Sequence, residues 1–292
     1  ATFNAYLNRS TEGQILTDLI GGGDAQAQAV AEIIQRTRPD VVLLNEFDYV
    51  ADGSAVDAFR DEYLEVSQNG ATPITYEHYY LAPSNTGTPA GMDFNNDGAT
   101  DGPDDAYGYG AFAGQYGMVL LSQYPIDETN ARSFQTFLWK DMPGALLPPD
   151  PNDTDADGDT DNYYNAAERD VFRLSPTTHW AAPILVGDER IHMLCSHPTP
   201  PVFDDGNDGD LDGLDDASGD PVADWNGRRN HDEIRFWADY VTPGEGNYIY
   251  DDNGDGGGIP DEAPFVVLGD QNASPVEGDA TGPAIQQLLI AS

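Results

Sequence analysis

The sequence predicts an α/β fold, and two features of its first part indicate this class. First, residues 25–38 carry apolar side chains at the spacing of an amphipathic helix, at Ala27, Val30, Ile33 and Ile34. Second, strand-like segments lie on either side of this helix, and the one after it is apolar throughout, as in strands buried on both faces of a sheet. Strand, helix and strand in this order form the β-α-β unit of a parallel sheet.

The remaining elements follow along the chain. Residues 1–7 are expected to form the first strand, which ends near Asn4. Asp24 is expected to cap the helix 25–38, and Pro39-Asp40 ends that helix before the buried strand 41–44. Further strands are predicted at 76–81, 117–122, 171–174, 180–186, 190–196 and 265–268, and further helices at 56–63, 230–240 and 283–290.

Polar residues stand where several of these strands end. Open α/β sheets bind ligands at the carboxyl ends of their strands, so we expect these side chains to share one cleft. They come from the first and second strands, from the strand 190–196 and from the strand 265–268. The residues are Asn4, Glu46, His197, Asp270 and Asn272.

The chemistry of these residues favours a hard metal and a phosphate. Asn4 and Glu46 offer only oxygen ligands, which is poor for Zn²⁺ and suits Mg²⁺ or Mn²⁺. His197 can donate a proton or bind phosphate as an imidazolium, although a turn histidine beside Pro198 is the simpler alternative. The stretch 269–272 can orient a water and hold a phosphate oxygen or a metal, or it can be an Asx turn after a strand.

The composition limits the partners. The chain has 292 residues, 39% of them hydrophobic, which is enough for one sizeable core. It carries 52 acidic and 12 basic residues, for a net charge of −40, so strong non-specific binding of duplex DNA is not expected. Cys195 is alone, which excludes an intramolecular disulfide framework, and no apolar run is long enough to span a membrane.

Four acidic, glycine-rich insertions interrupt the predicted elements, near 93–105, 150–162, 204–220 and 251–262. Each has oxygen ligands at positions 1, 3 and 5 and glycine at position 6, which is the spacing of a calcium loop. The first three add Asp at position 9, and the fourth has Glu at position 12. The predicted Ca²⁺ ligands are Asp93, Asn95, Asp97, Asp101, Asp153, Asp155, Asp157, Asp161, Asp208, Asp210, Asp212, Asp216, Asp251, Asn253, Asp255 and Glu262.

The calcium prediction bears on where the protein works. Such sites would be structural, and calcium is millimolar outside the cell rather than in the cytosol, which favours an extracellular, periplasmic or cell-surface location. The alternative is that these insertions are flexible acidic loops that solvate a salt-adapted surface.

Taken in order, the motifs resemble those of the endonuclease/exonuclease/phosphatase superfamily, which includes DNase I-like nucleases, inositol polyphosphate phosphatases and sphingomyelinases. The resemblance extends from residue 3 to residue 272. It implies a four-layer, two-sheet α/β sandwich, built as a single domain over 1–292, and divalent-metal-dependent phosphoester hydrolysis. The matching stretches are Thr2-Phe3-Asn4, Leu43-Leu44-Asn45-Glu46, 116–126, Ser196-His197 and Gly269-Asp270-Gln271-Asn272.

The resemblance also implies residue roles. Glu46 would bind the catalytic Mg²⁺ or Mn²⁺, with Asn4 in the same cluster. His197 would contact the phosphate or protonate the leaving group. Asp270 and Asn272 would position the attacking water and stabilise the transition state, largely through fixed donors and the metal.

Two further points come from the resemblance. Tyr116 would help to hold the phosphate. Members of the superfamily normally finish with another strand and an Asp-His pair, which this chain lacks after Asp270, and His231 on a predicted helix is a poor substitute. We therefore expect the sequence to be incomplete at its C-terminus, without the last strand or strands of the sandwich, and to begin downstream of its natural start.

The leading hypothesis is an exported, metal-dependent phosphoester hydrolase. Its substrate would be a small phosphate ester, a phospholipid headgroup or a nucleic acid. The alternative is a catalytically inactive, calcium-stabilised structural or surface-binding protein on the same fold, which the missing Asp-His pair and the acidic loops support. Hydrolysis of simple phosphoesters with Mg²⁺ or Mn²⁺ distinguishes the two hypotheses.

Overall fold

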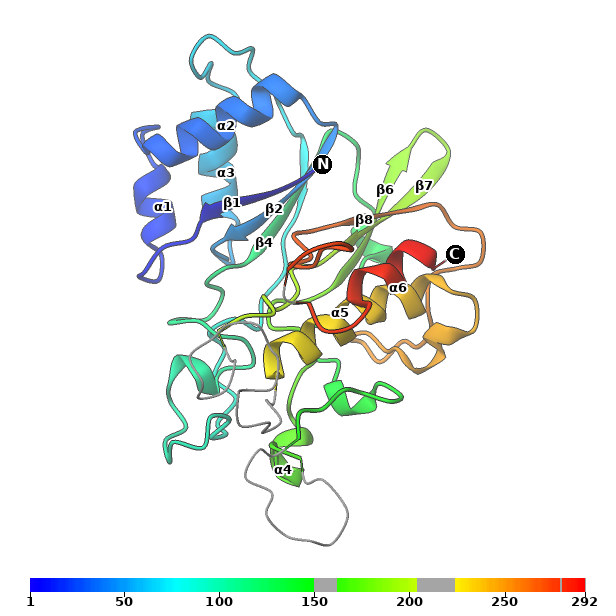
Figure 1. The fold of residues 1–292 in the computed structure, drawn as a ribbon. Coiled ribbons are helices and arrows are strands. Elements are labelled where there is room, and N and C mark those ends of the chain that lie inside the picture. Colours follow the sequence, from blue (N-terminus) through cyan, green and yellow to red (C-terminus); the bar gives the residue numbers. More distant parts are fainter. Residues whose placement is uncertain (150–161, 204–223, 279, 292) are drawn as a thin grey trace, which may run out of the picture.

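The computed structural model describes residues 1–149, 162–203, 224–278 and 280–291 and contains two four-stranded sheets (Figure 1). The first sheet has the order β1-β2-β4-β3, formed by β1 (Thr2–Leu7), β2 (Val41–Phe47), β3 (His78–Tyr80) and β4 (Met118–Ser122). The second has the order β5-β6-β7-β8, formed by β5 (Arg132–Ser133), β6 (Trp180–Val186), β7 (Glu189–Cys195) and β8 (Phe265–Leu268).

Each sheet contains one parallel pair, and these pairs set the position of the candidate site. In the first sheet β1 runs parallel to β2, with Asn4 opposite Asn45. In the second sheet β7 runs parallel to β8, with Cys195 opposite Leu268. The other pairs are antiparallel. Asn4 lies within β1 and Glu46 near the carboxyl end of β2, whereas His197 and Asp270 follow β7 and β8. Each parallel pair therefore presents its polar residues at one edge of its sheet.

Helices cover the outer face of each sheet (Figure 1). On the first sheet lie α1 (Gln14–Leu19), α2 (Ala25–Thr37) and α3 (Ser54–Phe59), which a π-helical turn continues over Arg60–Leu64. On the second lie α5 (Trp225–Val241) and α6 (Ala284–Ile290). Shorter pieces are α4 (Ala166–Arg169) and 3₁₀ turns at Pro103–Asp105, Glu128–Asn130, Trp139–Asp141 and Glu245–Tyr248.

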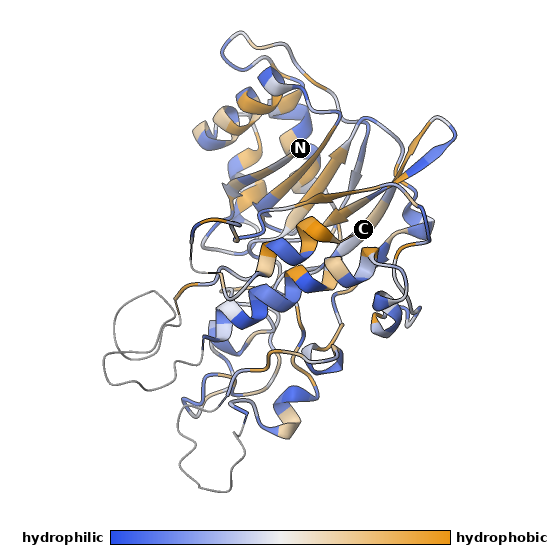
Figure 2. Ribbon diagram, turned by 45° about the vertical axis from the view of Figure 1, so that its right-hand side comes forward, coloured by the Kyte–Doolittle hydropathy of each residue, from blue (hydrophilic) through white to orange (hydrophobic). Residues whose placement is uncertain are grey.

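The two sheets pack face to face through a buried apolar layer, visible as orange strands in the interior of Figure 2. The first sheet contributes Leu43, Met118 and Leu120, and the second contributes Trp180, Ala182, Ile184, Met193, Cys195 and Leu268. A second apolar cluster lies between the first sheet and its helices, and a third lies between the second sheet and its helices. The order helix, sheet, sheet, helix confirms the predicted four-layer α/β sandwich.

Several predicted elements are confirmed and others change. Asp24 caps α2, since its Oδ1 accepts a hydrogen bond from Ala27 N at 2.7 Å. Helix α5 begins at Trp225 rather than at residue 230, because Asp224 Oδ1 caps it through Gly227 N. Helix α1 escaped prediction because no side chain caps it.

The strand predicted at 171–174 is wrong. An isolated bridge between Leu138 and Arg173 replaces it. The Phe172 ring packs into the aromatic cluster under α5, and the Arg173 guanidinium lies 3.9 Å from the centroid of the Tyr107 ring. The segment is apolar because it packs against loops, and not because it joins a sheet.

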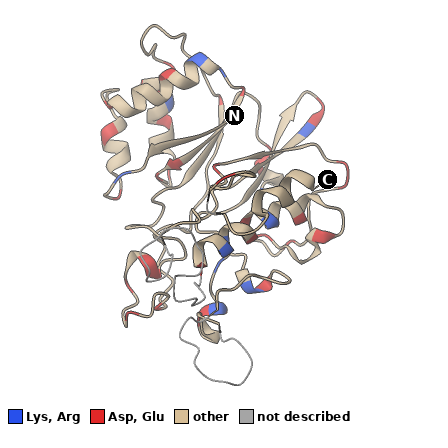
Figure 3. Cartoon of the chain, in the orientation of Figure 1, with Lys and Arg blue, Asp and Glu red and all other residues tan. Residues whose placement is uncertain are grey.

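Strand β8 is the last strand of the second sheet in the described part of the chain, and it is poorly covered. Phe265 and Val266 are 37% and 45% exposed. Acidic residues lie on helices beside both sheets and on loops, where the cartoon is red (Figure 3). Among the described residues, no helix has the length and apolar character needed to cross a membrane.

The inter-sheet layer predicts a large effect at Leu120. Leu120→Ala should lower the free energy of unfolding by about 2–5 kcal/mol, because it leaves a cavity between the sheets. Ile33→Ala, on the exposed side of α2, should lower it by roughly 0.5 kcal/mol. Urea unfolding measures both values, and equal losses would contradict the packing of the two sheets.

Candidate active site

The polar residues predicted at the strand ends meet where the two sheets adjoin. Asn4 Nδ2 donates to Glu46 Oε1 at 2.9 Å and to Asp270 Oδ2 at 3.1 Å. Asn4 and Glu46 come from neighbouring strands of the first sheet, and Asp270 follows the last strand of the second. One carboxamide therefore joins carboxylates from both halves of the sandwich.

Asn45, next to Glu46 in the sequence, also connects the two sheets. It is fully buried, and its Oδ1 accepts hydrogen bonds from Asp270 N at 3.2 Å and from Thr2 Oγ1 at 3.3 Å. Its Nδ2 donates to Ser196 O at 3.3 Å. The sequence placed Asn45 in a motif without giving it a role, since its partners lie far away along the chain.

The turn after β8 is both an Asx turn and part of the cluster. Asn272 N donates to Asp270 Oδ1 at 3.1 Å, as in an Asx turn, while Asp270 Oδ2 bonds to Asn4. Gly269 has φ +150°, and a Cβ there would lie 2.0 Å from Ser196 O. Glycine is needed because the turn crosses so close to the end of β7.

His197 lies beside the carboxylates and is nearly buried, with 7% of its surface exposed. Burial lowers the pKa of its imidazole, while the charges of Asp270 and Glu46 raise it. Among the described residues, no hydrogen-bond partner reaches Nδ1. An imidazole with an unpaired Nδ1 next to two carboxylates is suited to exchange a proton with a bound ligand.

The loop that carries His197 is tied to α5. Thr199 donates to Glu233 Oε2 twice, from its backbone N and from Oγ1, at 2.7 Å each. Burial raises the pKa of Glu233 to about 7, while the charge of Arg229 and the Thr199 hydrogen bonds lower it. Thr177 Oγ1 adds a hydrogen bond to His197 O at 3.1 Å.

Tyr116 stands next to Glu46 on the other side of the cluster. Burial raises the pKa of its phenol, and the negative charge of Glu46 adds to this effect, so the O–H remains available as a donor. Its backbone N donates to Asp48 Oδ1 at 3.1 Å, and Arg9 N donates to Asp48 Oδ2 at 2.7 Å. Burial raises the pKa of Asp48 to about 6, against these hydrogen bonds.

Sequence reasoning gave no role to Asn8 or Asp48. Asn8 Nδ2 donates to Glu46 Oε2 at 2.8 Å, so both carboxylate oxygens of Glu46 accept hydrogen bonds. Asp48 belongs to the Asn45-Glu46-Phe47-Asp48 stretch, and a second acid two residues after Glu46 was the one available signal. Its function in holding the backbone of Tyr116 depends on contacts that the sequence does not reveal.

Four of the ten non-glycine residues with left-handed backbone in the described part of the chain lie around the cluster. Glu46, Tyr116, Asn272 and Tyr6 have φ values of 60°, 55°, 50° and 50°, where non-glycine residues are uncommon. Conformations of this kind cost about 1–3 kcal/mol each and persist where the surrounding structure holds them, often at active sites. Their coincidence with the polar cluster supports a functional role for this edge.

The first acidic loop is organised around Asp93. Asp93 Oδ1 accepts from Asp97 N at 3.0 Å, its Oδ2 accepts from Gly98 N at 2.9 Å, and Asn95 Oδ1 also accepts from Asp97 N at 3.1 Å. Within the ranges that the structure describes, no three His, Cys, Asp or Glu side chains are close enough to hold a metal ion. The calcium ligands predicted at 153–161 and 208–216 lie outside the described residues.

In the fourth acidic loop an arginine stands where a cation was expected. The Arg132 guanidinium bonds to Asp251 Oδ2 at 2.8 Å, to Gly257 O at 2.7 Å and to Asp255 O at 2.6 Å. Asp251 Oδ1 accepts from Asn253 N at 3.0 Å and from Asp255 N at 2.9 Å. The predicted Ca²⁺ site at 251–262 is thus filled in part by a positive side chain.

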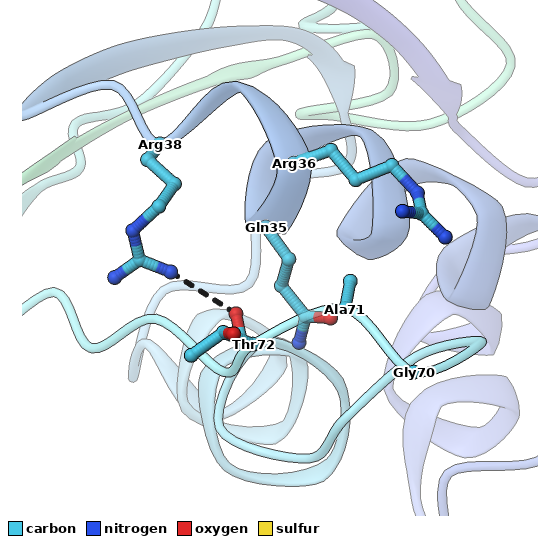
Figure 4. A pocket seen from close by; sticks show the side chains of 6 residues that line it. All are labelled: Gln35, Arg36, Arg38, Gly70, Ala71 and Thr72. Atoms are coloured by element: carbon cyan, nitrogen blue, oxygen red, sulfur yellow. Dashed lines mark hydrogen bonds between the residues drawn. The ribbon is translucent and has the colours of Figure 1, made fainter.

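A separate cleft of about 380 Å³ lies at the C-terminal end of α2 and is lined by Gln35, Arg36, Arg38, Gly70, Ala71 and Thr72 (Figure 4). Arg38 Nη1 donates to Thr72 O at 3.1 Å. Gln35 Nε2 donates to Tyr63 O at 3.1 Å and to Leu64 O at 2.9 Å. These side chains hold the adjoining loop, and the cleft lacks the carboxylates of the strand-end cluster.

Comparison with known proteins fits this arrangement. Residues 1–291 match the Endonuclease/Exonuclease/phosphatase family. The chain belongs to this family. No curated protein matches the sequence.

Solved structures with similarity to the chain include an endonuclease/exonuclease/phosphatase from Beutenbergia cavernae, with 12% identity and a TM-score of 0.44, over 98% of this chain and 51% of that one. This chain thus spans about half of the Beutenbergia structure. Beta toxin from Staphylococcus aureus has 13% identity and a TM-score of 0.39, over 99% and 68%. Sphingomyelinase C from Streptomyces griseocarneus has 17% identity and a TM-score of 0.40, over 99% of this chain and 67% of the sphingomyelinase.

The buried Glu233 predicts a pH-dependent stability. Its pKa is raised from 4.5 to about 7 in the folded state, so the folded protein holds a proton that the unfolded chain releases, and stability falls as pH rises through this window. Between pH 5 and pH 8 the free energy of unfolding of the wild-type protein should fall by about 1–3 kcal/mol more than that of the Glu233→Gln variant. Urea unfolding across this range measures the difference, and equal losses in both proteins would refute it.

Proposed function

We propose that the chain is a divalent-metal-dependent phosphoester hydrolase whose active site is the strand-end cluster. The observation that carries this proposal is the meeting of Glu46, Asn4 and Asp270 beside the nearly buried His197. Membership of the Endonuclease/Exonuclease/phosphatase family supports phosphoester chemistry. The left-handed backbone at this edge supports it independently.

The donor set fits Mg²⁺ or Mn²⁺. Glu46 would hold the ion, with Asp270 close to it, because carboxylate and amide oxygens are the ligands that these hard cations take. Asn4 would join them through Oδ1 once its carboxamide turns, since Oδ1 accepts from Tyr6 N at 3.2 Å and Nδ2 faces the two carboxylates. When bound, the ion would polarise a phosphoryl oxygen and offset the charge that develops in the transition state.

The protein's own residues would supply the remaining steps. Asp270 would orient the attacking water and accept its proton, and Asn272 is held against the same carboxylate through its backbone. The Tyr116 phenol would donate to a non-bridging phosphate oxygen. His197 would bind the phosphate and give a proton to the leaving group, since an anionic phosphate favours the imidazolium.

The substrate class remains broad: a small phosphate ester, a phospholipid headgroup or a nucleic acid. The net charge of −40 argues against strong non-specific duplex binding at low salt. An extracellular, periplasmic or cell-surface location is part of the proposal, and it rests on the acidic composition and the calcium-loop spacing.

The first test removes the carboxylates. Glu46→Ala and Asp270→Ala should each reduce kcat/KM by about 10³-fold or more for hydrolysis of bis(4-nitrophenyl) phosphate or 4-nitrophenyl phosphate with Mg²⁺ or Mn²⁺, because each removes a charged group from the reacting centre. The measurement is release of 4-nitrophenolate. Chelation of the metal should abolish the wild-type rate.

Matched surface variants provide the control. Glu65→Ala and Asp61→Ala remove exposed acids from the layer outside the first sheet and should keep the wild-type rate. Hydrolysis that survives both cluster substitutions would overturn the site. A wild-type protein without turnover would favour the inactive, calcium-stabilised alternative.

The acidic loops give a separate test. We propose Ca²⁺ binding at the loop 93–101, where side-chain oxygens of Asp93 and Asn95 already converge on the backbone N–H groups of Asp97 and Gly98. Chelation should then lower the Tm, and Ca²⁺ at a hundredfold excess over Kd should restore about 2.7 kcal/mol of stability. Asp93→Ala should weaken this response. A Tm indifferent to chelator and to added Ca²⁺ would show that the loops are merely solvated.

A further inference from the structure

The helix α5 contacts both loops that carry the candidate catalytic groups. We call residues 197–199 the histidine loop and residues 269–272 the aspartate loop. Asn230 of α5 is fully buried, and its Nδ2 donates to Thr199 O at 2.8 Å and to Gln271 O at 2.9 Å. The two protons of one carboxamide are therefore used on two different loops.

We propose that Asn230 is a positioning residue that fixes the separation between the histidine loop and the aspartate loop. This inference rests on the proposed function, because the separation matters when His197 and Asp270 act on one phosphate. Asn230 itself touches only the backbone of these loops in the contacts described above, and it would act through them.

The planar carboxamide is well suited to this bracket. Its two N–H groups diverge at a fixed angle, so the carbonyls of Thr199 and Gln271 cannot separate without losing a buried hydrogen bond. Leaving a buried carbonyl without a partner costs about 1–3 kcal/mol. A second link, from Asn272 Nδ2 to Pro198 O at 3.0 Å, ties the same loops closer to the cluster.

Helix α5, which carries Asn230, is packed firmly against the second sheet. On the side of α5 that faces the second sheet, Ile234 and Trp237 are fully buried. Trp237 Nε1 donates to Ser196 Oγ at 3.0 Å, and Arg229 Nε donates to Leu174 O at 2.7 Å. Sites supported by a packed helix are positioned more precisely than sites supported by loops alone.

Other contacts hold these loops nearer to the ends of β7 and β8, and Asn45 joins the two there through Ser196 O and Asp270 N. Glu233 holds the histidine loop through Thr199, and Asn45 holds the aspartate loop through Asp270 N. Removal of Asn230 should therefore leave both loops attached at these other contacts and let the spacing vary at Thr199 and Gln271. Small displacements of this kind reduce catalysis strongly, because reacting groups must be aligned closely.

The experiment compares Asn230→Ala with Gln35→Ala. Gln35 is also a buried carboxamide that brackets backbone carbonyls, but it holds a loop under α2. Both variants should lose stability in urea unfolding. Only Asn230→Ala should lower kcat, by about tenfold or more with KM within about twofold, because alignment and not binding is impaired.

Two readouts separate positioning from general destabilisation. Asn230→Ala should reduce kcat more for glycerophosphocholine than for bis(4-nitrophenyl) phosphate. The alkoxide leaving group of the first substrate needs a proton, whereas the aryl leaving group of the second does not. In a protein that already carries His197→Ala, adding Asn230→Ala should reduce kcat little further. Equal losses on both substrates, or full additivity with His197→Ala, would overturn the inference.

Hydrogen exchange tests the bracket without turnover. Asn230→Ala should speed exchange in both 196–200 and 268–273, whereas Gln35→Ala should speed it near 63–68 and leave the two loops unchanged. Faster exchange in one loop alone, or in neither, would refute the bracket. A wild-type chain that hydrolyses nothing would refute the proposed function, and the exchange result would still decide whether Asn230 joins the loops.

Discussion

The candidate site depends on the hydrogen bonds that Asn4 and Asn45 make across the gap between the two sheets. Neither sheet holds a complete set of polar groups, since Glu46 comes from the first and Asp270 and His197 from the second. The apolar layer between the sheets brings their edges together, and these amides fix the final alignment. Fold and chemistry therefore share one constraint: the sheets must pack in a single register for the cluster to exist.

Much of this could be predicted, because buried strands and amphipathic helices leave periodic patterns, and polar residues at strand ends interrupt those patterns visibly. The positions of Asn4, Glu46, His197 and Asp270 followed from such interruptions. Asn8, Asp48 and Asn230 could not be found in this way, since each acts on a group distant in sequence. The wrong strand at 171–174 has the same origin: an apolar run shows burial but does not show what buries it.

The acidic loops show a similar limit. Alternate oxygens with a glycine at the sixth position create a site for positive charge, and the sequence alone does not say which charge fills it. In the loop after α5, Arg132 supplies that charge through Asp251 and two backbone carbonyls. A guanidinium presents several donors in a plane and needs no particular coordination number, so it can replace a metal where the loop packs against the domain.

Because β8 is partly exposed and the molecule is highly charged, salt should affect folding and association in different ways. Among the described residues β8 pairs on one side alone, with β7, and an open strand edge that carries partly exposed apolar residues such as Phe265 and Val266 is a template for pairing with another molecule. The net charge of −40 keeps molecules apart while the solution is dilute in salt. Added salt relieves repulsion within each molecule, but it also shortens the range over which neighbours repel one another. Folding stability and colloidal stability should thus respond to ionic strength in opposite directions.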